Sequence, residues 1–313
     1  MYYVYFVNCK AAAMGTAAID GTVTFMNPYG YLNGEMYYFM PFYLSVSILS
    51  VLCVGAWGIL AYIHRDQLTA LQKGIAGVIA LFTFQCFVLY FDDLGYNWTG
   101  ANYVAAMICG VLIATAVRTV SRALVLTICL GYEATITSFS MLQWKVIPLA
   151  VLYGIFSGML NIAELIQRTT NVNTATLFLL VFPVGFFDIT FGIWSIIAWV
   201  RTTRNLKLLE DTKKVKQYQI FGMILISVFG VSLSFVMSEA LVVSATDFDD
   251  TWQTNWIWSA FWILFYFTVL ASIAILWRPA GRYKYNKLHL EPEEEGEIAL
   301  PLPVINSNST ALD

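Results

Sequence analysis

Long apolar runs separated by short polar segments dominate the pattern along this chain. A hydrocarbon core about 30 Å thick needs about 20 mainly apolar residues for one helical crossing. Several runs approach or exceed this length without strand-like alternation, so each predicts a membrane-spanning helix. These runs cover residues 39–63, 74–91, 146–164, 176–200, 218–243 and 256–277.

A further apolar stretch, Ala101–Phe139, decides the topology because it carries two arginines. Arg118 and Arg122 mark either a charged turn between two short helices or one long helix with two intramembrane cations. An intramembrane arginine costs roughly 2.5–3.5 kcal/mol on insertion scales, which is tolerable where it faces protein or water. The i, i+4 spacing of Arg118 and Arg122 places both side chains on one face of a helix.

The distribution of Lys and Arg among the loops distinguishes these alternatives. Cytoplasmic loops are enriched in basic residues, so the basic segments 64–73, 201–217 and 278–287 should share one side of the membrane. This requires an even number of crossings between the first two segments, which the single-helix alternative provides. We therefore predict an all-α membrane protein, a seven-transmembrane helix bundle with a lumenal N-terminus and a cytosolic C-terminus. The acidic segment 92–100 then lies outside, which predicts glycosylation of its sequon at Asn97.

Composition agrees with a membrane protein and divides the chain into three parts. The 313 residues are 59% hydrophobic and 12% charged, with a mean hydropathy of +0.68, whereas soluble domains have roughly a quarter charged residues. Residues 1–38 are polar and turn-rich, with a strand-like pattern in Ile19–Phe25. Residues 39–278 form the predicted membrane domain, and residues 279–313 a predicted disordered cytosolic tail. No signal peptide precedes the N-terminus that is predicted to be outside, so we expect a missing upstream segment.

The predicted spans contain few charges besides the two arginines. An unpaired buried charge is costly, so we expect Asp188 and Glu239 to be the partners of Arg118 and Arg122, with Glu133 in the same helix as the arginines. The cluster indicates either a polar cavity that holds a lipid headgroup, another ligand or an ion, or interhelical ion pairs that fix the packing. The sequence leaves both alternatives open.

No pattern typical of catalysis is present in the sequence. Ser-His-Asp, HExxH and P-loop patterns are absent, and five cysteines without close spacing form no zinc motif. We expect no enzymatic activity, cofactor, metal site or nucleic-acid partner, and we expect membrane lipids as partners. The Gly154 and Gly158 spacing favours close helix packing. In the tail, Tyr285 and Leu288 fit the Tyr-x-x-apolar pattern that sorting adaptors bind.

Several segments together carry the pattern of a known family. They are TVTFMNPYGYLNGEMYYFMPFY (Thr22–Tyr43), RTVSRALVLTICLGY (Arg118–Tyr132), PVGFFD (Pro183–Asp188) and LWRP (Leu276–Pro279). The chain resembles, over about residues 19–287, the lung seven-transmembrane receptor family, also called Golgi-localised GOLD-domain seven-transmembrane proteins. Glu133-Ala134-Thr135 departs from the Gly and basic, Pro-containing turn that usually follows in this family.

The resemblance implies a bundle similar to that of G-protein-coupled receptors, a Golgi location, a role in membrane trafficking and a membrane-open cavity that takes lipid. Family members carry a lumenal β-sandwich domain before the first helix, of which residues 1–25 have room for the last strand or so. The first hypothesis is therefore a Golgi or endosomal protein that acts in vesicle-mediated transport, as a sorting receptor or membrane chaperone of trafficking cargo.

Two other functions are retained as alternatives. The first alternative is a ligand-sensing receptor that is coupled to G proteins at the plasma membrane. Against it, the third helix lacks an Asp/Glu-Arg-Tyr signature, and the seventh lacks both NPxxY and the lysine that a retinal Schiff base needs. An ion channel or lipid transporter that uses the charge cluster is the other, although no filter-like or repeat pattern accompanies it.

Overall fold

The computed structural model describes residues 24, 26–132, 139–169, 174–210, 212–245, 253–254 and 256–279. Within these ranges seven helices are long and apolar enough to cross a membrane, as the hydrophobic pattern predicted. A short helix, α1 (Gly34–Tyr37), precedes them, and a 3-10 turn, η1 (Arg65–Gln67), follows the first. The long helices are α2 (Phe39–Ile63), α3 (Ala70–Thr99), α4 (Val104–Cys129), α5 (Phe139–Thr169), α6 (Thr174–Leu208), α7 (Thr212–Ala245) and α9 (Trp256–Leu276).

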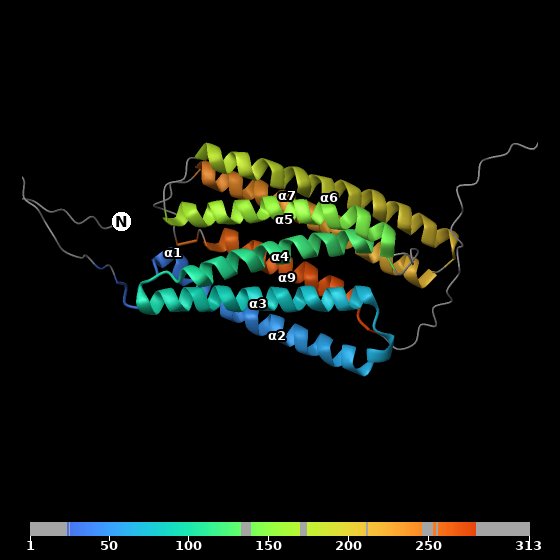
Figure 1. Ribbon diagram of the computed structural model, residues 1–313, viewed down its shortest axis with the longest axis horizontal. Coiled ribbons are helices and arrows are strands. Elements are labelled where there is room, and N and C mark those ends of the chain that lie inside the picture. The colour runs from blue at the N-terminus through green and yellow to red at the C-terminus, as the bar shows by residue number, and fades with distance from the viewer. Residues whose placement is uncertain are drawn as a thin grey trace, which may run out of the picture. The chain divides into compact units, whose positions relative to one another are not determined.

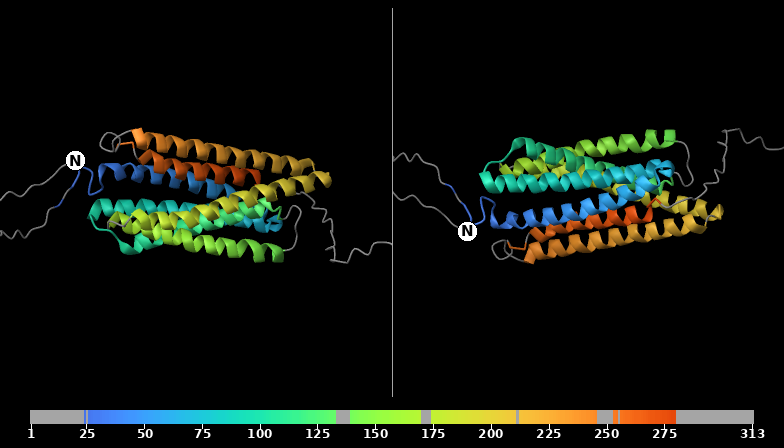
Figure 2. Two further views of the ribbon diagram at one scale, coloured as in Figure 1. Left: turned by 90° about the horizontal axis from the view of Figure 1, so that it is seen from above. Right: turned by 90° about the horizontal axis from the view of Figure 1, so that it is seen from below.

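The helices form an up-and-down bundle in which sequence neighbours pack side by side (Figure 1). Helix α9 lies between α2 and α7 and so closes the bundle, as both views in Figure 2 show. Helix α4 packs against α3, α5 and α6. Large apolar side chains are exposed on the outside of the bundle, among them Phe182 and Phe229. On a membrane protein these side chains face the lipid chains.

One end of the bundle, which we call the basic end, holds the α2–α3 turn, the α6–α7 turn and the C-terminus of α9. The last four carbonyls of a helix have no partner within the helix, and side chains of other helices bond two of them at the end of α9. Gln72 Nε2 of α3 donates to Trp277 O at 3.1 Å, and Gln217 Nε2 of α7 donates to Leu276 O at 3.0 Å. These bonds hold α3, α7 and α9 together at this end.

The C-terminus of α4 is bonded in the same way at the basic end. Thr202 Oγ1 of α6 donates to Cys129 O at 2.9 Å, and Tyr218 OH of α7 donates to Ile128 O at 3.1 Å. The basic segments 64–73 and 201–217 therefore share one end of the bundle, and the stretch with the two arginines crosses it once. Both points agree with the distribution of Lys and Arg in the sequence.

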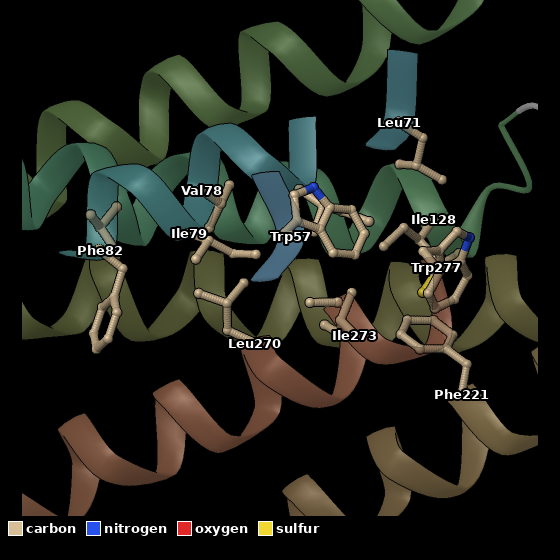
Figure 3. Close-up of a cluster of buried hydrophobic side chains, with 14 of the residues drawn as sticks. Trp57, Leu71, Val78, Ile79, Phe82, Ile128, Phe221, Leu270, Ile273 and Trp277 are labelled. Carbon is tan, nitrogen blue, oxygen red and sulfur yellow. The ribbon is translucent and has the colours of Figure 1, made fainter. Parts of the chain in front are cut away.

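The larger apolar core lies between α2, α3, α4, α6, α7 and α9 (Figure 3). Near the basic end, Phe221 and Trp277 meet edge to face with ring centroids 5.0 Å apart, close to Ile128. Farther along, Phe82 packs against Phe267 with ring centroids 5.8 Å apart. A second core of buried residues lies between α4, α5 and α6. Helices α4 and α6 contribute to both cores, so their packing fixes how the two halves of the bundle meet.

Several predicted boundaries are wrong. The arginine-bearing helix ends at Cys129 rather than continuing to Phe139, because Gly131 takes a left-handed conformation with φ 76° that stops the helix. Helix α5 already begins at Phe139 and runs through the predicted break at residues 143–145. The predicted strand, Ile19–Phe25, lies outside the described residues except for Thr24, and the predicted tail does so except for Pro279.

Two segments predicted as polar loops are largely helical. Helix α3 continues through residues 92–99 to Thr99, and the described residues of the segment 201–217 are helical except Leu209 and Glu210. Polar composition there marks where the helices leave the apolar layer, whereas their ends are set by capping. The start of α3 has a capping box between Thr69 and Gln72, and its end has Gly100 with φ 66°.

The arrangement of the ends predicts which positions are accessible from the same side of a membrane. We expect Asp66→Cys and Leu209→Cys to react with an impermeant maleimide from one side of sealed vesicles, because both lie at the basic end. Trp98→Cys should react only from the other side. Labelling above the wild-type background is the measurement, and reaction of Asp66→Cys and Leu209→Cys from opposite sides would refute the topology.

Candidate intramembrane polar site

An ion pair joins α4 to α6 inside the membrane-spanning part of the bundle. Arg122 Nε of α4 donates to Asp188 Oδ1 of α6, and both side chains remain about one third exposed, at 34% and 37%. The predicted pairing of Asp188 with one of the two arginines is therefore present. Because water is scarce in the hydrocarbon layer, a partly open ion pair there requires water or a polar ligand to approach it.

A tyrosine of α5, Tyr153, also contacts Arg122. The guanidinium carbon of Arg122 lies 4.7 Å from the centroid of the Tyr153 ring, within range of a cation–π interaction. Tyr153 is itself buried and packs edge to face on Phe191 with ring centroids 5.8 Å apart. One arginine thus engages helices α5 and α6 at the same time.

Polar groups continue along α4 toward the end opposite the basic end. Asn161 Nδ2 of α5 donates to Thr115 Oγ1 at 2.8 Å, and the buried Thr119 hydroxyl has no hydrogen-bond partner among the described residues. Glycine permits this close approach of α4 and α5, because a Cβ at Gly154 would lie 3.2 Å from Thr119 Oγ1. The Gly154 and Gly158 spacing therefore lies at the α4–α5 contact, where close packing was predicted.

Arg118 lies one turn from Arg122 on α4 and is exposed. Its side chain makes no hydrogen bond or ion pair to the described residues, whereas the Arg118 carbonyl accepts a bond from Arg122 Nη1 at 3.4 Å. A guanidinium cannot lose its proton in a protein, so its charge must be balanced by something outside these residues. The site thus combines this exposed cation with a partly open ion pair, a set that suits an anionic group.

The structure does not bring Glu239 to the arginines, so this part of the predicted cluster is wrong. Tyr218 of α7 lies level with Ile128 of α4, because their hydrogen bond joins the two helices. At 1.5 Å per residue, Glu239 lies about 31 Å along α7 from that level. Arg122 lies only about 9 Å along α4 from the same level. Glu239 is half-buried and pairs with no described residue. Glu133 lies outside the described residues and beyond the end of α4.

Asn97, the predicted glycosylation site, instead holds the segment that leads into the first helix. It is buried in the last turns of α3, where its Nδ2 donates to Tyr29 O at 2.8 Å and its Oδ1 accepts from Leu32 N at 3.2 Å. Its carbonyl accepts from Tyr31 N at 3.1 Å. With the amide nitrogen occupied and buried, this geometry disfavours attachment of a glycan.

Two glycines permit the close contact between residues 27–32 and Asn97 of α3, which we call the clamp. Gly30 has φ 133°, and a Cβ there would overlap the Asn97 side chain. At Gly100, a Cβ would lie 2.9 Å from Tyr31 Cδ1. Asn27 closes the turn by donating from Nδ2 to Leu32 O at 2.7 Å. The turn-rich composition of residues 1–38 predicts a turn here but not its docking on α3, which no local pattern indicates.

The remaining predictions concern metal binding, the cysteines and the sorting motif. Groups of three or more metal-binding side chains do not occur among the described residues. The four cysteines described, Cys53, Cys86, Cys109 and Cys129, are free thiols. The proposed sorting motif, Tyr285 and Leu288, lies outside the described residues.

Seven membrane-spanning helices around an intramembrane arginine–aspartate pair define the class of this protein as a polytopic helical membrane protein. Its sequence matches the family described as "GOST, seven transmembrane domain" over residues 38–283, and the chain belongs to that family. This confirms the family resemblance found in the sequence.

Relatives with similar sequences are also membrane proteins by name. The chain is 28% identical to human Transmembrane protein 87A over 284 residues, covering 90% of this chain and 50% of the relative. It is 24% identical to mouse Transmembrane protein 87B, covering 95% and 53%. It is 24% identical to Membrane protein PTM1 of Saccharomyces cerevisiae (strain YJM789), covering 83% and 51%. The chain thus spans about half the length of these relatives.

We predict that the Arg122–Asp188 pair contributes more to stability than a surface pair. Asp188→Asn or Arg122→Gln alone should lower the free energy of unfolding by about 1–3 kcal/mol, because each leaves an unpaired polar partner within the membrane. The double variant should lose less than the sum of the two. Thermal unfolding of the protein in lipid nanodiscs measures the loss of stability in each variant. The control is Asp66→Asn, which disrupts the exposed Arg65–Asp66 pair and should change stability by less than about 0.5 kcal/mol. Additive single and double variants would contradict the pairing.

Two variants that both remove the sequon separate the clamp from glycosylation. Asn97→Ala should lower stability by about 1–3 kcal/mol and expose residues 27–32 to protease, because Leu32 N loses its buried acceptor. Thr99→Ala removes the sequon but keeps the clamp, so it should behave like the wild type. Deglycosylation of the wild-type protein should leave its electrophoretic mobility unchanged. A mobility shift lost in both variants would show that Asn97 carries a glycan.

Proposed function

We propose that this chain is the membrane domain of a Golgi and endosomal protein that acts in vesicle-mediated trafficking, as a sorting receptor or membrane chaperone. The observation that carries the proposal is membership of the family over residues 38–283, for which the resemblance of the sequence implies this location and role. The positive-inside rule supports an orientation with the basic end in the cytosol and the N-terminus in the lumen.

The polar site gives this role a molecular basis. Arg118 lies exposed beside the partly open Arg122–Asp188 pair, so a membrane lipid that places a phosphate or carboxylate there would neutralise its charge. Binding that requires both an anionic group and the bilayer around it suits a protein that acts on membrane cargo. The chain acts here by binding and carries out no catalysis.

The basic end favours this role over that of a G-protein-coupled receptor. Side chains of α6 and α7 bond the last carbonyls of α4, through Thr202 and Tyr218. Opening a cytosolic cavity between these helices would break both bonds, at a net cost of about 0.5–1.5 kcal/mol for each, since water can replace the lost donor.

Imaging of the tagged full-length protein in cells tests the proposal. We expect a signal that coincides with Golgi markers, with a smaller endosomal fraction. Tyr285→Ala should increase the fraction at the plasma membrane, because it removes the sorting pattern that retrieval adaptors bind. Tyr283→Ala is the matched control, since Asn286 three residues later is not apolar. A wild-type protein found only at the plasma membrane would instead support the receptor alternative.

A further inference from the structure

A groove opens between α7 and α9. Its volume is about 520 Å³, within the range of about 300–1,000 Å³ usual for small-molecule sites. Its walls are mainly apolar and combine side chains of both helices near the basic end. They are Ile220, Ile224, Ser272, Ile275, Leu276 and Arg278.

The groove faces the membrane. Ile220 and Ile275 remain 36% and 69% exposed, so the described helices do not cover them. The hydroxyl of Ser272 donates within its own helix to Thr268 O at 2.8 Å and so presents little unsatisfied polarity. In a bilayer, such a trough of aliphatic side chains is filled by hydrocarbon.

Two cations lie at the end of the groove nearest the membrane surface. Arg278 lines it, is exposed, and its side chain makes no ion pair or hydrogen bond to the described residues. Lys216 is also exposed and lies one turn before Ile220 on α7, so the spacing of Lys216, Ile220 and Ile224 places all three on one stripe of the helix. The groove is thus apolar along its length and positively charged at one end.

The walls of the groove are held in place by bonds between the two helices. Gln217 Nε2 of α7 donates to Leu276 O of α9 at 3.0 Å. Behind it, Phe221 is fully buried against Trp277. These contacts fix the distance between α7 and α9 without a ligand, so binding requires little ordering of the protein.

We infer that this groove binds an anionic glycerophospholipid from the leaflet at the basic end, with an acyl chain along Ile220, Ile224 and Ile275 and its phosphate at Lys216 and Arg278. A lipid is the occupant whose own charge and apolar length match both parts of the groove. Basic pockets between membrane helices bind anionic headgroups on the cytoplasmic side in this way. The site is separate from Arg118, which lies on α4, and does not depend on the proposed trafficking role.

Native mass spectrometry of the purified full chain in detergent, titrated with phosphatidylserine or with phosphatidylcholine of the same acyl chains, tests the inference. We expect phosphatidylserine to bind more tightly. The double variant Lys216→Gln/Arg278→Gln should weaken its binding about tenfold or more, because each basic residue near the membrane surface contributes about 1 kcal/mol. Unchanged binding in this variant would overturn the inference.

Further variants locate the site. Ile220→Trp and Ile275→Trp each fill the trough from one wall, and each should reduce binding of both lipids. One variant serves as a control that should retain wild-type affinity. Lys73→Gln removes an exposed cation at the same end of the bundle on α3. Equal loss in the Lys73→Gln control, or no loss in both tryptophan variants with wild-type melting temperatures, would place the lipid elsewhere.

Discussion

A permanently charged arginine inside a membrane helix needs an anionic partner, and this requirement fixes how α4 packs against its neighbours. Arg122 of α4 meets it by pairing with Asp188 of α6 and lying over the ring of Tyr153 of α5. Because one side chain engages two neighbouring helices, it restrains both the rotation and the depth of α4. Helix α4 contributes to both apolar cores, so this restraint extends to the packing of the whole bundle.

The two ends of the bundle are held by the same kind of interaction. At the basic end, side chains such as Tyr218 and Gln217 bond the free carbonyls of neighbouring helices. At the opposite end, Asn97 bonds backbone groups of residues 29–32 through its side chain and its carbonyl. Polar side chains thus bond the free backbone groups where helices end. Arg118 lies between the two ends, and its side chain has no partner among the described residues.

Much of the architecture could be predicted from the sequence, because helices that span a membrane must be apolar and the basic loops between them lie mainly on one side. The single crossing by the arginine-bearing helix followed from where Lys and Arg lie, and Asp188 followed because few anions were available. Glu239 was assigned wrongly, since composition gives the charge of a residue but not its depth along a helix. The helix ends near Thr99 and Cys129 were also misplaced, because Gly100 and Gly131 set them rather than the apolar layer.

The two cationic sites differ in what they require of a ligand, because they lie at different depths. Arg118 lies within the apolar layer, where interactions between charges are weakly screened and an unpaired charge is costly. Lys216 and Arg278 lie at the membrane surface, where water and salt screen them and each contributes little alone. Binding at the surface groove must therefore draw on the apolar contacts of Ile220, Ile224 and Ile275, whereas binding at Arg118 depends on charge. A lipid therefore satisfies the groove by its chain and its headgroup together, whereas it satisfies Arg118 by its headgroup alone.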